Sequence, residues 1–290
     1  MNKYKLQLKT LSKVILSGRE SSALYKGVDY NKEEKCNIIY PFYSYEDRML
    51  KSDETYKLAK NYYIPGSSFK GALLSFCEDE DFHRIKTYDI PVAGADNITK
   101  ITLKKIQYLY YDDKKDGKNK EPKLKEFMPN VGVEVLKHNK VVETCIATTL
   151  NRDKIEALIS RNNEFNRKKL ERYINILDER LKYVNKKFRY DRHATEVASG
   201  GTDEALMALN NLKNRVREIL SKDDILMFIG GYKGLNNSLR KGLEVNSTQT
   251  QKQIPQPSKK IGVNSSARMG FFVDDEVYLP YGIVTISMNG

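Results

Sequence analysis

Apolar and polar residues alternate in the first segment of the chain and predict a strand. Within residues 4–11, Leu6 and Leu8 are flanked on both sides by polar residues. A period of two is typical of a strand that buries one face and exposes the other. We therefore expect a sheet of this protein to begin close to the N-terminus.

Apolar runs rich in β-branched and aromatic residues predict further strands along the rest of the chain. They cover residues 37–43, 98–111, 131–136, 141–149, 225–229 and 280–286, and the apolar runs 270–273 and 277–279 flank an acidic turn. The runs 131–136 and 141–149 flank a polar turn at 137–140 and predict a pair of neighbouring strands. Between 112 and 125 the chain is charged, which predicts a loop.

Two apolar stripes at steps of three and four residues predict a helical hairpin over residues 151–222. The first stripe consists of Leu170, Tyr173, Ile174, Leu177, Leu181, Val184 and Phe188. A segment with two glycines, 198–202, interrupts the pattern, and the second stripe runs from Leu206 to Leu220. We interpret both stripes as core positions; the alternative is a groove for a partner.

Residues 62–74 predict a turn that leads into a helix. Pro65 fixes φ and Gly66 permits positive φ, so the chain is expected to turn here. Ser67 or Ser68 can then cap a helix by accepting a hydrogen bond from a free backbone N–H group. The helix is expected to run from Phe69 to about residue 78.

Lys70 falls in the first turn of that helix, where a cation opposes the helix dipole. An anion held between the ammonium group and the free N–H groups would make this position favourable. A turn, two hydroxyls, a helix N-terminus and a lysine together suit a phosphate. The alternative is an ordinary capped helix with a surface lysine.

The charge of the chain indicates an anionic partner. The 290 residues include 50 Lys and Arg against 38 Asp and Glu, a net charge of +12. A protein this basic usually binds a polyanion or an acidic surface. Residues 232–268 hold seven cations and one acid, which predicts a loop that orders on RNA; the alternative is a solubilising loop. The 19 tyrosines and ten phenylalanines are sources of stacking groups for bases.

The sequence predicts a cytoplasmic protein without a membrane segment. No run of about 18 apolar residues is present, and the N-terminus lacks the apolar core of a signal peptide. Cys36, Cys77 and Cys145 are odd in number and widely spaced, as expected for reduced thiols.

No spacing of side chains indicates a metal or a cofactor. The histidines His83, His138 and His193 lie 55 residues apart, without a second ligand at the short spacing of zinc sites. The acidic run 77–81 is interpreted as the solvated end of a helix rather than a metal site. Neither a catalytic serine and histidine order nor a phosphate-binding glycine loop of the common types is present.

Residues 64–73, Ile-Pro-Gly-Ser-Ser-Phe-Lys-Gly-Ala-Leu, resemble the signature of the RAMP proteins, the RNA-binding subunits of type III CRISPR effector complexes. The turn at 15–18, the strand and glycine-rich loop at 225–235, and the C-terminal segment 265–284 are similar to the same superfamily. The last two are most similar to the RAMP subunit that caps the end of the Csm-type complex.

The resemblance implies an α+β protein with a ferredoxin-like, RRM-type RAMP fold and the helical hairpin as an insertion. The expected organisation is a RAMP core with the signature over 1–150 and the hairpin over 151–222. Residues 223–290 are expected to add the glycine-rich loop, the basic loop and the C-terminal strands of the core.

The resemblance also implies a function in antiviral defence. It implies a crRNA-binding subunit that holds the 3′ region of the guide through its backbone, without strong sequence readout. Expected partners are crRNA, target RNA and other RAMP subunits, and no cofactor. The RNA-binding residues implied by resemblance and charge are Gly18, Arg19, Gly66, Ser67, Ser68, Lys70, Gly230, Gly231, Lys233, Arg240, Lys241 and Arg268.

Two other functions remain open at this point. In the backbone RAMP subunit, an aspartate in the loop after the first strand supports cleavage of target RNA, and Asp29 is the candidate catalytic residue of such an endoribonuclease. Asp29 can equally be a loop aspartate without chemistry. The second alternative is a stand-alone basic protein that binds single-stranded RNA outside CRISPR.

Overall fold

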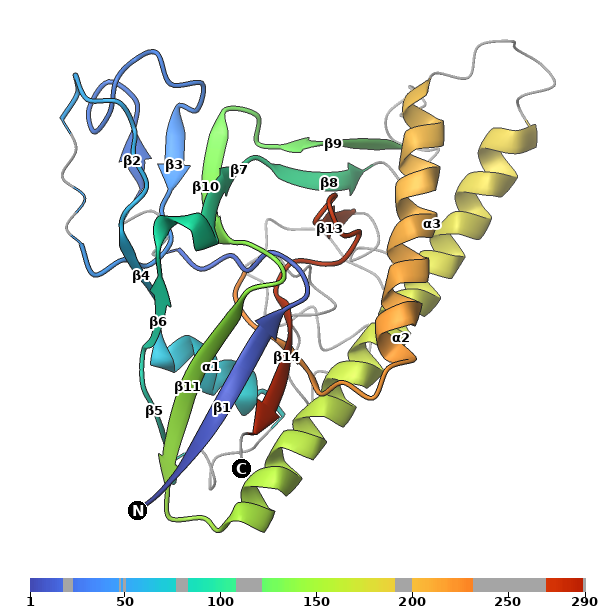
Figure 1. Cartoon of the computed structure of the whole chain (residues 1–290). Coiled ribbons are helices and arrows are strands. Elements are labelled where there is room, and N and C mark those ends of the chain that lie inside the picture. Colours follow the sequence, from blue (N-terminus) through green and yellow to red (C-terminus); the bar gives the residue numbers. More distant parts are fainter. Residues whose placement is uncertain are drawn as a thin grey trace, which may run out of the picture.

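The structure is a computed structural model of the chain. It describes residues 1–17, 23–46, 48, 51–76, 83–107, 122–190, 200–231 and 270–288, with the backbone alone at 95, 186–190 and 200–202. Within these residues the protein is a mixed α+β structure with several antiparallel sheets (Figure 1).

The largest sheet joins the two ends of the chain. It has the order β12-β14-β1-β11-β5, formed by β12 (Leu226–Phe228), β14 (Ile283–Met288), β1 (Asn2–Thr10), β11 (Val141–Thr148) and β5 (Ile85–Thr87). Every pair of neighbouring strands is antiparallel. Strand β1 therefore lies between one strand from the middle of the sequence and one from its end (Figure 1).

The alternation predicted for the first strand is confirmed. Leu6 and Leu8 of β1 are buried, whereas Lys5 and Lys9 are exposed. The buried side chains point to the face covered by helices, because successive residues of a strand alternate between its two faces. The opposite face of β1 is open to solvent and carries lysines.

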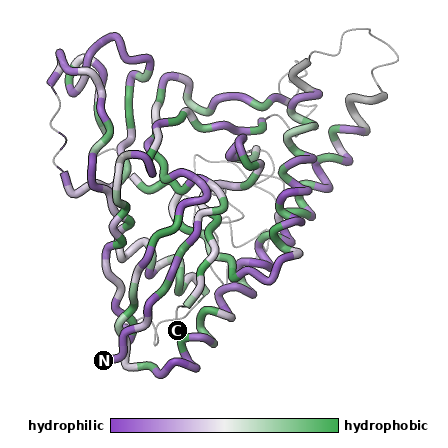
Figure 2. Tube along the Cα trace, in the orientation of Figure 1, coloured by the Kyte–Doolittle hydropathy of each residue, from purple (hydrophilic) through white to green (hydrophobic). Residues whose placement is uncertain are grey.

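Three helices accompany this sheet. The short helix α1 (Gly66–Leu73) comes between β1 and β5 in the sequence, and α2 (Arg152–Tyr190) and α3 (Gly200–Leu220) come between β11 and β12. The predicted hairpin is confirmed, with α2 packed along α3 (Figure 1). Figure 2 shows hydrophilic and hydrophobic residues following one another at short intervals along both helices, as expected where one side is buried.

The helices divide the core into two main clusters. The first includes Leu6 and Ile146 of the sheet, Phe69 of α1 and Ile159 of α2. The second lies between α2, α3 and the sheets, and Leu177 is one of its fully buried members. The first half of α2 packs into the first cluster, and its second half packs into the second cluster. The helix therefore begins at Arg152, well before the apolar stripe that runs from Leu170 onward.

The remaining strands form three smaller sheets. One has the order β2-β3-β10-β7, from β2 (Leu24–Tyr25), β3 (Ile38–Tyr40), β10 (Val131–Leu136) and β7 (Ile98–Ile101). Another is β13 (Phe271–Val273), β8 (Leu103–Gln107) and β9 (Lys123–Phe127). The last pairs β4 (Asn61–Ile64) with β6 (Ile90–Ala93), and a 3₁₀ turn, η2 (Ala95–Asn97), follows β6.

The expected pairing of residues 131–136 with 141–149 is wrong, although both segments are strands. Strand β10 pairs with β3 and β7, while β11 pairs with β1 and β5. Thr10 provides the physical reason: its hydroxyl donates to the Lys137 carbonyl at 2.8 Å and its carbonyl accepts the Asn139 N–H at 2.7 Å. The turn is thus held by the end of β1, and β11 continues alongside β1.

No helix in the described part of the chain is both long and apolar enough to cross a membrane.

Candidate nucleic-acid interface

The signature segment forms the end of β4 and the whole of α1. Helix α1 begins at Gly66 with Pro65 as its N-cap residue and without a side-chain cap. The Pro65 carbonyl accepts the N–H groups of Ser68 and Phe69 at 2.9 and 3.1 Å. The expectation that Ser67 or Ser68 caps the helix is therefore wrong, because both residues already lie inside its first turn.

An aspartate that the sequence reasoning missed lies at this helix N-terminus. The Gly66 N–H donates to Oδ1 of Asp89 at 2.7 Å, and the Thr87 hydroxyl donates to the Gly66 carbonyl at 2.8 Å. A carboxylate at a helix N-terminus is favoured by the helix dipole. Asp89 thus supplies an anion at the start of α1. Lys70 lies in the last turn of α1, where the helix dipole favours a cation, so the expectation that Lys70 opposes the dipole is wrong.

Gly66 is required for a different reason from the one expected. It is not among the described glycines with positive φ. Instead, a Cβ at this position would lie 2.8 Å from the Tyr88 carbonyl carbon and 2.9 Å from its oxygen. The glycine therefore allows the chain around Tyr88 and Asp89 to pass directly against the start of α1.

The signature residues divide between core and surface. Phe69 and Leu73 are buried in the first core cluster. Ser67 is exposed, and Ser68 and Lys70 are half-buried. Two hydroxyls and an ammonium group therefore lie within four consecutive positions of α1, and all three residues are at least partly exposed.

Four tyrosines surround the same turn. The rings of Tyr45 and Tyr63 are stacked with centroids 4.3 Å apart, and Tyr43 lies 5.7 Å from Tyr63. Tyr45 and Tyr88 are exposed. Burial, followed by the negative charge of Asp89, raises the pKa of Tyr45 and of Tyr63 above the ordinary value. Asp89 is therefore close enough to act on both rings, and both remain neutral phenols.

The glycine-rich loop after β12 contacts the chain itself. Gly230 has φ +88°, and a Cβ there would lie 2.4 Å from the Ile15 carbonyl oxygen. The Gly231 N–H donates to the same oxygen at 2.8 Å. The close approach that these glycines allow is therefore made to Ile15, in the segment that follows β1.

The candidate catalytic residue Asp29 closes a tight turn. Its Oδ2 accepts the Tyr25 N–H at 2.7 Å, and its own N–H donates to the Tyr25 carbonyl at 2.8 Å. Gly27, between them, has φ +78°. Asp29 is only partly exposed, and this geometry gives its carboxylate a structural role.

The other predicted RNA-binding residues are not described. Gly18, Arg19, Lys233, Arg240, Lys241 and Arg268 lie outside the described residues. The acidic run 77–81, with Cys77, also lies outside them. The side chains that the structure does describe form no group of three or more metal-ligating residues.

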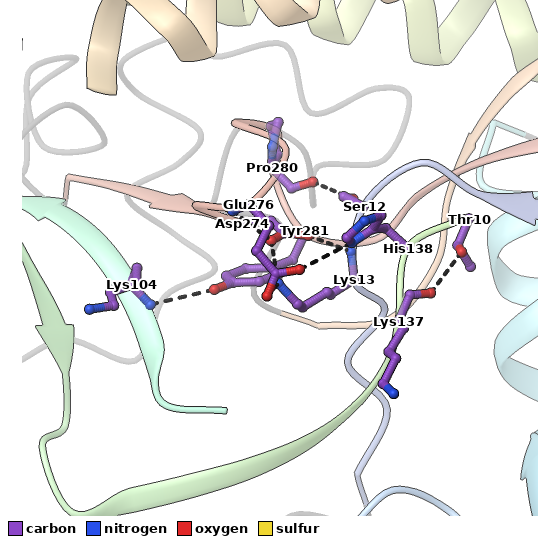
Figure 3. Close-up of polar contacts among 10 residues, drawn as sticks. All are labelled: Thr10, Ser12, Lys13, Lys104, Lys137, His138, Asp274, Glu276, Pro280 and Tyr281. Atoms are coloured by element: carbon purple, nitrogen blue, oxygen red, sulfur yellow. Dashed lines mark hydrogen bonds and ion pairs between the residues drawn. The ribbon is translucent and has the colours of Figure 1, made fainter. Parts of the chain in front are cut away.

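A buried ionic cluster connects the start and the end of the chain (Figure 3). Nζ of Lys13 lies 2.7 Å from Oδ1 of Asp274 and 2.8 Å from Oε1 of Glu276. Oδ2 of Asp274 accepts the Lys13 N–H at 2.8 Å. Nδ1 of His138 lies 3.4 Å from Oε2 of Glu276. Since Asp274 is fully buried and satisfied by Lys13, this cluster is best explained as a structural link.

No family model and no curated protein matches the chain. Among solved structures, the chain is similar to one from the "Cryo-EM structure of Csm-crRNA-target RNA ternary complex in type III-A CRISPR-Cas system". The two chains are 12% identical with a TM-score of 0.49, over 99% of this chain and 100% of that one.

Proposed function

We propose that this protein is an RNA-binding subunit of a type III CRISPR effector complex, most similar to the RAMP subunit that caps the Csm-type complex. It holds the guide RNA, in its 3′ region, through the RNA backbone. The observation that carries the proposal is the signature segment 64–73, whose polar side chains Ser67, Ser68 and Lys70 lie close together in the sequence of α1 and are at least partly exposed.

The order of the strands supports the proposed fold. Strands β14, β1, β11 and β5 are neighbours in that order and alternate in direction. With α1 between β1 and β5 and α2 between β11 and β14, this is the arrangement of a ferredoxin-like β-α-β-β-α-β unit. In this proposal, residues 1–150 and 223–290 build the RAMP core, and 151–222 extend its second helical connection.

The distribution of charge supports an RNA partner. The net charge is +12, and the open face of β1 exposes Lys3, Lys5 and Lys9 to solvent. Contacts with phosphates supply most of the sequence-independent affinity for nucleic acid. Such contacts hold a guide of any sequence, as a CRISPR subunit must. The proposed partners are crRNA, target RNA and the neighbouring RAMP subunits.

The polar side chains of α1 suggest how a phosphate is held. The hydroxyls of Ser67 and Ser68, in the first turn, donate to phosphate oxygens, and Lys70, three residues after Ser67, supplies the positive charge. The Gly66 N–H is already bound to Asp89, so side chains rather than that backbone group make the contacts. The glycine aims them by allowing α1 to begin directly against Tyr88.

Replacing Lys70 tests this site. Lys70→Ala should weaken binding of single-stranded RNA by roughly 1–2 kcal/mol, the scale of a charge-assisted hydrogen bond. Lys154→Ala is the control for loss of a lysine, because Lys154 is an exposed lysine of another helix, α2, and it should leave the affinity close to that of the wild type. Both variants should keep the wild-type melting temperature.

Two results would contradict the proposal. If Lys70→Ala unfolds the protein while the folded fraction binds RNA as before, Lys70 is structural and the phosphate site does not exist. If the tagged protein, purified from its host, carries no repeat-derived small RNA and no neighbouring subunits, it is not part of a CRISPR effector complex. A capping subunit is expected once per complex, whereas a backbone subunit is expected several times.

A further inference from the structure

Three tyrosines lie on one face of a short ribbon next to α1. Ser44 forms an isolated bridge with Tyr62, and the Tyr43 carbonyl accepts the Tyr63 N–H at 3.0 Å. Side chains alternate along paired strands. Tyr43, Tyr45 and Tyr63 therefore share one face, opposite the face that buries Tyr62.

Two of these rings form a stack that ends at the surface. The planes of Tyr45 and Tyr63 are 24° apart with centroids at 4.3 Å, and Tyr43 packs against Tyr63 at 49°. Tyr45 is nevertheless 56% exposed. Much of its ring is thus available to another flat group, while Tyr63 supports it from below.

The backbone that carries Tyr45 is fixed. Oε1 of Glu46 accepts the backbone N–H groups of Lys60 and Asn61 at 2.9 and 2.8 Å, and the Tyr45 N–H donates to the Asn61 carbonyl at 3.1 Å. These bonds tie residues 44–46 to the start of β4. Since the ring is already positioned, a ligand that stacks on it avoids part of the entropy cost of ordering a loop.

The exposed group of the stack favours bases over phosphates, because the ring of Tyr45 is uncharged and exposed. The face of a nucleobase is neutral and stacks on aromatic side chains with about 1–3 kcal/mol per base, whatever the sequence. Asp89, which acts on both Tyr45 and Tyr63, binds Gly66 of α1, so the rings border the turn of Ser67 and Ser68.

We propose that Tyr45, supported by Tyr63 and Tyr43, is a stacking platform for a base of single-stranded RNA. It lies beside the phosphate contacts of α1 and binds without selecting among the bases. The inference rests on the proposed function. It adds that this part of the same RNA interface binds a nucleobase. An unpaired strand is required, because a base inside a duplex does not offer its face.

The test compares a short oligouridine RNA with an abasic strand of the same length. The wild type should bind oligouridine more tightly than the abasic strand. Tyr45→Ala and Tyr45→Leu should weaken oligouridine binding by about 5- to 100-fold, the equivalent of the stacking energy of one base. Neither variant should change binding of the abasic strand, and Tyr45→Phe, which keeps the ring, should bind both strands like the wild type.

Met207→Ala is the control for loss of a large exposed side chain, because Met207 of α3 is 55% exposed and lies on the hairpin. It should bind both strands normally, and all variants should keep the wild-type melting temperature. If the wild type binds both strands equally and Tyr45→Ala binds them as well as the wild type, the platform is overturned while RNA binding stands. If Tyr45→Ala binds both strands normally but no longer co-purifies with neighbouring subunits, the tyrosines dock a protein instead. If the wild type binds neither strand, the proposed function itself fails.

Discussion

At the scale of single residues, two glycines of α1 have opposite surroundings. A Cβ on Gly66 would lie 2.8 Å from the Tyr88 carbonyl carbon, whereas a Cβ on Gly71 would meet nothing within 4 Å. Gly66→Ala should destabilise the protein by about 1–3 kcal/mol through overpacking. Gly71→Ala should stabilise it by up to about 1 kcal/mol, because alanine favours the helix.

Urea unfolding of both variants measures the difference directly. The two substitutions are chemically identical and lie five residues apart on one helix, so each serves as the control for the other. Equal effects on the free energy of unfolding would show that the contact with Tyr88 does not determine the choice of glycine. RNA binding by the folded Gly66→Ala protein should also fall, since the turn that aims Ser67 and Ser68 would shift.

Part of the candidate site could be predicted from the sequence at this scale. Local spacing correctly predicted a helix after Pro65, but the helix begins at Gly66 rather than at Phe69, so that Ser67 and Ser68 lie in its first turn and Lys70 lies in its last turn. Asp89 and Tyr45 could not be found in this way. They reach α1 only because residues 43–45 and β6 (Ile90–Ala93) flank β4 on both sides, and such pairing depends on partners far away in the sequence.

At the scale of elements, the carboxylate of Glu46 holds residues 44–46 against the start of β4 through hydrogen bonds. The stability that these hydrogen bonds contribute should decrease at acidic pH. Hydrogen bonds from the backbone of Lys60 and then Asn61 lower the pKa of Glu46 below its ordinary value. A carboxylate whose pKa is lower in the folded protein contributes stability that is fully present above its unfolded pKa, about 4.3, and lost as pH falls through the folded pKa.

Thermal melts of wild type and Glu46→Gln from pH 7 to pH 3 test this. The wild type should be more stable at pH 7, and the difference should shrink as the pH falls below about 4, where Glu46 of the wild type becomes neutral. A difference that stays constant down to pH 3 would mean that the charge of Glu46 does not contribute.

A buried carboxylate, that of Glu134, holds β10 to the segment before β4. Glu134 is fully buried, accepts the Phe42 N–H at 2.8 Å, and pairs with Arg48 and the Tyr56 hydroxyl. Glu134→Ala should lower the free energy of unfolding by about 3–5 kcal/mol, because it leaves a buried arginine without its partner.

Denaturant unfolding of the pair of variants tests whether the charge is the cause. Adding Arg48→Met to Glu134→Ala should recover part of the loss, since the unpaired charge is then removed. A single variant that loses less than about 1 kcal/mol, or a double variant no more stable than the single one, would contradict this account.

The sequence predicted which segments form strands and helices better than it predicted which strands pair with one another. The β1 strand and the hairpin of α2 and α3 follow from periodicity alone, because burial of one face imposes it locally. The pairing of residues 131–136 with 141–149 was wrong because Thr10, more than 120 residues away, holds the intervening turn. A polar turn between two strands does not reveal whether they belong to the same sheet.

At the scale of the whole molecule, residues near the C-terminus pack against residues near the N-terminus. Strand β14 pairs with β1 from Leu6 to Thr10, and the Lys13 and Asp274 contact joins segments 261 residues apart (Figure 3). The hydroxyl of Ser12 adds a further contact by donating to the Pro280 carbonyl at 2.7 Å. No local pattern in the sequence shows that these segments meet.

Removing β14 should therefore unfold the whole structure rather than one part of it. The strand lies between β12 and β1, and its side chains enter both main clusters: Val284 and Ile286 the first, Ile283 the second. A chain that ends at Leu279 should show no cooperative thermal transition, because each cluster loses fully buried residues and two strands lose their partner. Circular dichroism melts of this chain and of one that lacks only Asn289 and Gly290 give the comparison, and the shorter deletion should melt like the wild type. A cooperative transition at the wild-type temperature in the chain ending at Leu279 would show that β14 is a peripheral addition to the fold.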